Sequence, residues 1–131
     1  MRDVVRSRTA PQIIVSDADY ERLTDLATAS MQRLPDVARE LLAEMDRAKV
    51  VDAGAVPADV VRMGSTVTFK SDDGQTRRMT LVYPADESLD QHRISVMTPI
   101  GAALIGLHVG QSISWTARDG RRHDLTVLKV E

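Results

Sequence analysis

The spacing of hydrophobic and polar positions changes once along the chain, close to residue 53. Before this point, apolar residues recur three and four positions apart, as they do on one face of an α-helix. After it, apolar and polar residues tend to alternate, which is typical of half-buried strands. A Gly and a Pro within residues 52–57 mark the break. The sequence therefore predicts an α+β protein with a helical unit at residues 1–52 and a sheet unit at residues 53–131.

The helical unit is predicted to contain two helices joined by a tight reversal at residues 31–35. Ser16 can cap the first helix, and Pro35 suits the first turn of the second. At about 1.5 Å per residue, helices of about 14 and 17 residues give an arm of roughly 20–25 Å. The apolar stripes of the two helices should pack together as a short antiparallel coiled-coil hairpin. The stripes consist of Tyr20, Leu23, Leu26, Ala27 and Met31, and of Val37, Leu41, Leu42, Met45 and Ala48.

The sheet unit is predicted to be an antiparallel sheet with one short helix lying against it. Two segments have the composition of hairpin turns, residues 71–74 and 118–120, and each ends in Gly. Alternation predicts strands at residues 66–69, 79–83, 94–97, 112–117 and 124–130.

The short helix is predicted within residues 98–110, where both of its ends are marked. Thr98 is a candidate N-cap, and Pro99 fits the first helical position because its missing N–H is not needed there. Gly106 can adopt the left-handed conformation that ends a helix, and Gly110 can turn the chain into the next strand. The apolar face of this helix consists of Ile100, Ala103, Leu104 and Leu107.

Composition places further limits on this picture. The 131 residues are 43% hydrophobic but only 3% aromatic, so the core must be aliphatic. The chain has no cysteine, which excludes disulfides and thiolate metal sites. No apolar run approaches the roughly 18 residues of a membrane span, and residues 1–8 lack the apolar centre of a signal peptide. We expect a cytoplasmic protein with no membrane partner.

Charge and motifs argue against nucleic-acid binding and catalysis. The net charge is −2, and neither half of the chain carries an excess of basic residues, so sequence-specific nucleic-acid binding is not expected. His92, His108 and His123 lack metal-ligand spacing. Phosphate-loop, dinucleotide and nucleophile-elbow patterns are missing. We therefore expect no catalytic residue, no metal and no cofactor.

Residues 98–110 resemble a pattern of the C-terminal domain of the Gre transcript-cleavage factors. That pattern is Ser-Pro-(Ile/Leu)-x-x-Ala-Leu-(Ile/Leu)-Gly-x-x-Val-Gly. Gly101 and Ala102 after the Pro-Ile step, with Trp115 in the next strand, are more similar to the Gre-related Rnk family, regulators of nucleoside diphosphate kinase. Residues 13–17, 56–65, 81–85 and 94–97 also fit, so the resemblance covers most of residues 12–131. It implies that the sheet unit is FKBP-like.

The resemblance also implies a partner and a contact surface. The C-terminal domain of Gre factors docks on the largest subunit of RNA polymerase, at the rim of the secondary channel. Carried over, the contact residues would be Thr98, Pro99, Ile100, Gly101 and Leu104, although Ile100 and Leu104 could instead belong to the core. An FKBP-like fold also suggests prolyl isomerase activity as a hypothesis. The few aromatic residues of this unit make that activity unexpected.

Transcript cleavage by Gre factors requires a long arm whose acidic tip holds magnesium, since carboxylates are the ligands that this cation prefers. Here the arm is short, and its tip, Arg33, Leu34, Pro35 and Asp36, carries one acid. The resemblance therefore implies a non-catalytic regulator that competes with Gre factors on the polymerase. Two alternatives remain open: regulation of nucleoside diphosphate kinase independently of the polymerase, and a residual isomerase or cleavage-stimulating activity.

Overall fold

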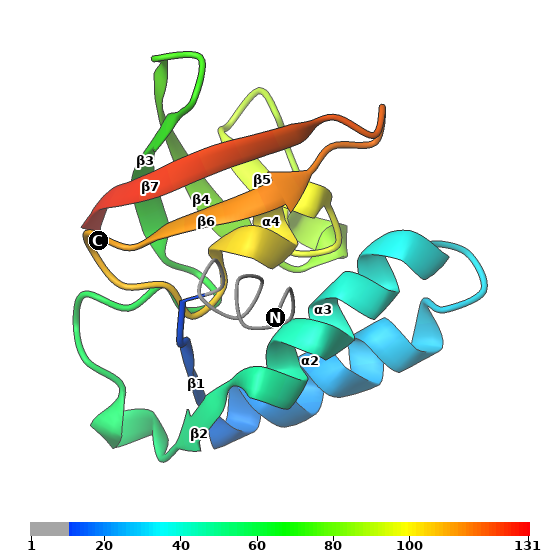
Figure 1. The fold of residues 1–131 in the computed structure, drawn as a ribbon. Helices are drawn as coiled ribbons and strands as arrows, with labels where there is room; N and C mark the ends of the chain where they lie inside the picture. Colours follow the sequence, from blue (N-terminus) through cyan, green and yellow to red (C-terminus); the bar gives the residue numbers. More distant parts are fainter. Residues whose placement is uncertain (1–10) are drawn as a thin grey trace, which may run out of the picture.

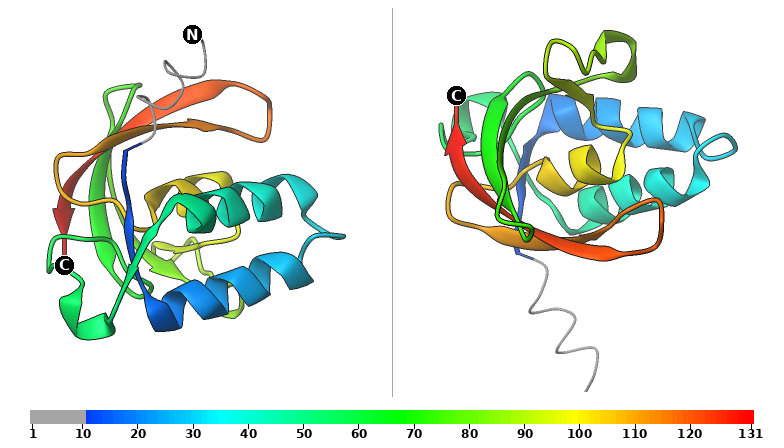
Figure 2. Two further views of the ribbon diagram at one scale, coloured as in Figure 1. Left: turned by 60° about the horizontal axis from the view of Figure 1, so that its bottom comes forward. Right: turned by 90° about the horizontal axis from the view of Figure 1, so that it is seen from above.

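The computed structural model describes residues 11–131 (Figure 1). Residues 1–10 lie outside the described part, and with them the start of the predicted helical unit and the segment 1–8. Within residues 11–131, no helix is both long enough and apolar enough to cross a membrane. The fold consists of a curled sheet, one short helix inside its curve, and a pair of longer helices beyond that helix (Figure 2).

The five-stranded sheet has the order β5-β4-β3-β7-β6. Both predicted hairpin turns are present, and Gly74 and Gly120 adopt the positive φ that these turns require. The strands are β3 (Thr66–Ser71), β4 (Thr76–Val82), β5 (Arg93–Ser95), β6 (Ser112–Thr116) and β7 (Arg122–Val130).

The prediction of a wholly antiparallel sheet is wrong at one edge, where β5 runs parallel to β4. The short 3₁₀ helix η2 (Pro84–Asp86) follows β4, and Ser88 bridges to Arg93. His92 then turns the chain at a φ of 57°. This compact connection brings the chain back to enter β5 in the same direction as β4. Alternation within a strand cannot reveal that direction.

Two helices run side by side in opposite directions below the sheet (Figure 1). They are α2 (Asp17–Ala29) and α3 (Pro35–Arg47). The Asp19 N–H donates to Ser16 Oγ at 3.1 Å, which confirms the predicted N-cap, and α3 starts at the predicted Pro35. Each helix has 13 residues, so the second is shorter than the expected length of about 17. It ends early because β2 (Lys49–Val51) pairs in parallel with β1 (Ile14–Ser16), a two-stranded sheet that the sequence analysis missed.

One buried apolar cluster joins the helix pair to the sheet. It includes Leu23 and Leu41 of the helices, Phe69 of β3 and Leu104 of the short helix, all fully buried. A backbone hydrogen bond also joins β1 to the segment after the short helix: the Ile14 N–H donates to the Gly106 carbonyl oxygen at 3.1 Å. The division of the chain at residues 52 and 53 stays a prediction. The helix pair is packed on the rest of the described chain and does not project freely.

Candidate functional site

The short helix α4 (Pro99–Leu104) begins as predicted and presents its first residues at the surface. The Gly101 N–H donates to Thr98 Oγ1 at 3.1 Å, so Thr98 is the N-cap. The same hydroxyl donates to the Ser95 carbonyl at 2.7 Å, which ties the helix start to β5. Pro99 takes the first helical position, and Thr98, Pro99 and Ile100 are half-buried.

Two of the five predicted contact residues are buried behind this helix start. Leu104 exposes none of its surface. Gly101 lies so close to β5 that a Cβ placed on it would be 2.1 Å from the Ser95 carbonyl oxygen. Both residues therefore hold the helix in place, and a partner can reach only Thr98, Pro99 and Ile100 of the predicted set.

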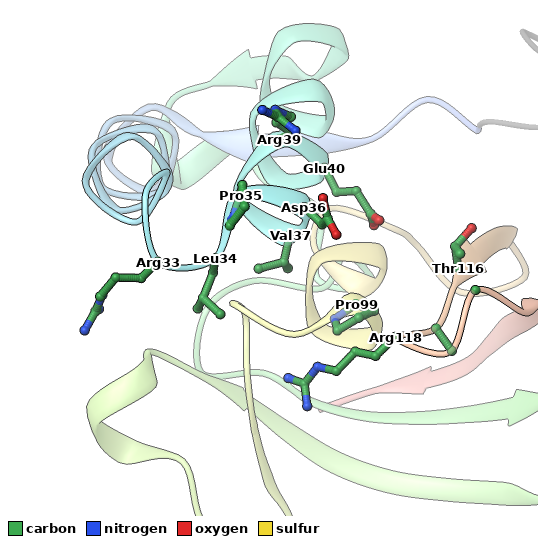
Figure 3. A pocket seen from close by; sticks show the side chains of 12 residues that line it. Arg33, Leu34, Pro35, Asp36, Val37, Arg39, Glu40, Pro99, Thr116 and Arg118 are labelled. Carbon is green, nitrogen blue, oxygen red and sulfur yellow. The ribbon is translucent and has the colours of Figure 1, made fainter.

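Pro99 lies on a groove with a volume of about 640 Å³, which we call the arm-tip groove (Figure 3). One wall is residues 33–37 with Arg39 and Glu40, and the other is the β6–β7 hairpin at Thr116, Ala117, Arg118 and Gly120. The structure thus brings together the predicted arm tip and the predicted helix start. The sequence analysis treated these as separate sites because they are far apart in the chain.

A second hollow, of about 800 Å³, lies on the other side of Pro99 and is called the Trp115 hollow. Its apolar lining includes Leu89, Ile94, Ile100 and Trp115, and Leu89 is 69% exposed. The sequence analysis missed Leu89 because its segment carries no regular pattern. Both hollows share Pro99, Ala117 and Arg118, so the helix start borders both of them.

Two carboxylates lie one helical turn apart on the α3 wall of the arm-tip groove, Asp36 and Glu40. The pKa of Glu40 is raised above its ordinary value, first by burial and then by repulsion from Glu44 and Asp36. Glu44 is paired with Arg47 at 2.5 Å. Neither Asp36 nor Glu40 forms an ion pair with another residue between 11 and 131.

A separate polar contact lies where β3 and β7 meet. His123 Nδ1 is 3.4 Å from Asp72 Oδ1, and its ring is 5.1 Å from that of Trp115. The Asp124 N–H donates to Asp72 Oδ2 at 3.1 Å. This backbone bond, with help from His123, lowers the pKa of Asp72. The partners are distant in sequence, so the sequence analysis missed them. Among residues 11–131, no three His, Asp or Glu side chains converge to hold a metal.

Comparisons with known proteins agree with this fold. Residues 56–131 match the family model "Transcription elongation factor, GreA/GreB, C-term", and residues 11–51 match "Rnk N-terminus". The Escherichia coli K12 protein named "Regulator of nucleoside diphosphate kinase" is 43% identical over 122 residues, covering 92% of this chain and 90% of that protein. The chain belongs to the Rnk family of GreA/GreB-related proteins.

Two members of the wider GreA/GreB family match this chain over different shares of their own length. Transcription elongation factor GreA of Chloroflexus aggregans is 39% identical over 93 residues, which cover 70% of this Rnk-family chain and 59% of GreA. A solved structure titled "Prokaryotic transcription elongation factor GreA/GreB from Nitrosomonas europaea" has 36% identity and a TM-score of 0.72. That match covers 90% of this chain and 98% of the other. The relatives are named as regulators or factors.

Proposed function

We propose that this Rnk-family protein is a non-enzymatic transcription regulator that binds RNA polymerase and competes there with GreA-type factors without stimulating transcript cleavage. It acts in the cytoplasm and uses no metal or cofactor. Its partner surface is the rim of the secondary channel on the largest subunit. The observation that carries the proposal is the position of Pro99, half-buried between two open hollows in a chain of this family.

The docking unit is the FKBP-like sheet domain, and its contact residues are Thr98, Pro99 and Ile100. Apolar side chains around Pro99 supply the area that a protein partner can bury, and burial is the main favourable term in association. Gly101 and Leu104 contribute indirectly, because they fix α4 against β5 and the core. A rigid helix start lowers the entropy lost on binding.

The arm supports binding without cleavage. Helices of 13 residues span about 20 Å at about 1.5 Å per residue. The 93 aligned residues are 59% of the Chloroflexus aggregans GreA, so that factor is longer than this chain. The tip, residues 33–36, carries one acid, Asp36, and one base, Arg33, where the cleavage factors that the chain resembles carry an acidic pair to hold magnesium. The arm therefore supplies neither the reach nor the ligands for cleavage.

Binding to purified core RNA polymerase tests the proposal. Wild-type protein should bind with micromolar affinity or better, about −8 kcal/mol at 1 μM. Pro99→Asp should abolish this binding, because it places an unpaired charge in an apolar contact. Pro57→Asp is the matched control, since Pro57 is exposed and outside both hollows. Failure of the wild-type protein to bind at tens of micromolar would contradict the proposal.

A second candidate function is regulation of nucleoside diphosphate kinase independently of the polymerase. The observation that favours it is the name of the Escherichia coli relative, "Regulator of nucleoside diphosphate kinase". Kinase abundance and activity should be measured in cells that produce wild-type protein or Pro99→Asp. If both forms change the kinase equally while only the wild type binds polymerase, this second function is the correct one.

A further inference from the structure

The arm tip lies against the proposed docking surface. Residues 33–37 form one wall of the arm-tip groove, and Pro99 stands beside them (Figure 3). The wall is held in place because α3 packs on α4 and shares its buried core through Val37, Ala38 and Leu41. An arm anchored in this way cannot act as an independent probe unless that packing is broken.

We propose that the arm-tip groove receives a basic side chain, next to an apolar residue, from the same polymerase segment that docks on Pro99. The arm tip is then part of the docking surface. This inference rests on the proposed binding to polymerase. Beyond that binding, it specifies the part of the arm that contacts the polymerase and the kind of side chain that the polymerase presents there.

The apolar half of this proposal rests on the groove walls. Leu34 is 41% exposed, and Pro35 and Pro99 add further accessible apolar surface on either side of the groove. Leu34, Pro35 and Pro99 therefore offer apolar surface that a partner can bury. An apolar side chain placed between Leu34 and Pro99 would cover both of these residues at once.

The basic half rests on the charges of the α3 wall. The side chains of Asp36 and Glu40 extend toward the hairpin side of the groove, whereas Arg33 and Arg39 extend away from it (Figure 3). Arg118 passes beneath Pro99, and no ion pair joins it to either carboxylate. Two like charges one turn apart repel each other. The pKa of Glu40 is raised first by burial, and then by repulsion from Glu44 and Asp36. A partner's Lys or Arg would relieve this repulsion.

Cross-linking locates the partner segment. The chain has no cysteine, so Gln32→Cys, at an exposed position beside the arm tip, and Arg118→Cys each create a single site for a maleimide photo-cross-linker. Bound to core RNA polymerase, both labelled proteins should cross-link to one polymerase segment that contains Lys or Arg. Asp25→Cys, at an exposed position of α2, is the control and should not reach that segment. A Gln32→Cys label that reaches a remote segment, or none, would overturn the inference.

Charge removal tests the chemistry. The double variant Asp36→Asn/Glu40→Gln should bind core polymerase about tenfold more weakly, with a flatter dependence on salt. Asp25→Asn/Asp46→Asn makes the same change in net charge at exposed positions outside the groove, and should bind like wild type. Unchanged or tighter binding by the Asp36/Glu40 variant, or equal weakening by the control pair, would refute a basic occupant.

The outcomes separate this inference from the proposed function. If Pro99→Asp abolishes binding while the Asp36/Glu40 variant binds normally, polymerase docking stands and the basic occupant is wrong. If wild-type protein does not bind polymerase, the proposed function and this inference fail together.

Discussion

Gly101 provides a sharp stability test of the helix start, because local helix preference and tertiary packing predict opposite signs. In an exposed helix interior, Gly→Ala stabilises by up to about 1 kcal/mol. At Gly101, however, the new Cβ would lie 2.1 Å from the Ser95 carbonyl oxygen and 2.9 Å from Val96 Cα. These are backbone atoms, which cannot rotate away as a flexible side chain would.

The size of the effect follows from this clash. Non-bonded carbon atoms sit roughly 3.5 Å apart, and the backbone of β5 can shift only slightly. To restore ordinary contact, α4 must therefore move away from β5 by about 1 Å. That movement strains the bond from the Thr98 hydroxyl to Ser95 and loosens buried Leu104. Overpacking a tight site costs about 1–3 kcal/mol, so we expect Gly101→Ala to lower the free energy of unfolding by about 2 kcal/mol.

Urea unfolding followed by circular dichroism measures this change. With a slope of about 1–2 kcal/mol per molar urea, the midpoint should fall by about 1–2 M. Gly54→Ala is the matched control, because a Cβ there meets nothing within 4 Å, and its midpoint should change little. A Gly101→Ala protein as stable as wild type would refute the packing argument, and a more stable one would show that helix preference dominates.

Three further predictions concern the same region and are tested by urea unfolding. Thr98→Val should lower the free energy of unfolding by about 1–2 kcal/mol because it removes the N-cap, whereas Thr98→Ser should recover most of the loss; equal stability of both would contradict the capping role. Leu104→Ala should cost about 3 kcal/mol because Leu104 is fully buried, and the half-buried Ile100→Ala should cost less. Glu40→Gln should stabilise by about 0.2–0.5 kcal/mol at neutral pH by relieving repulsion from Asp36 and Glu44. Folding raises the pKa of Glu40, so the charged form of Glu40 destabilises the folded state. This destabilisation develops as the pH rises from the ordinary pKa of 4.5 through the raised pKa. The stability gained by Glu40→Gln should therefore disappear in more acidic buffer.

Local signals along the chain were sufficient to predict most of the elements. The N-caps at Ser16 and Thr98, the start of α3 at Pro35 and the turn glycines all act within a few residues of sequence. Each works through its own backbone geometry, so the surrounding fold is not needed to recognise it.

Features that join distant segments could not be predicted in the same way. The pairing of β1 with β2 and the parallel direction of β5 depend on how the connections fold back. The arm-tip groove depends on α3 packing against α4, which brings Asp36 and Glu40 to the same groove as Pro99. The family pattern predicts Gly101 and Leu104 as contact residues, with the core as the alternative for Leu104, and only their burial assigns both to the interior.

The central claim is that this protein occupies the Gre site on RNA polymerase without stimulating cleavage. The most direct test adds it to a stalled elongation complex, alone and together with GreA, and follows the length of the transcript. The protein alone should cause no shortening, and it should reduce GreA-stimulated cleavage in a concentration-dependent way that Pro99→Asp does not reproduce. Shortening by the protein alone that depends on Asp36, or undiminished GreA cleavage at saturating protein, would contradict it.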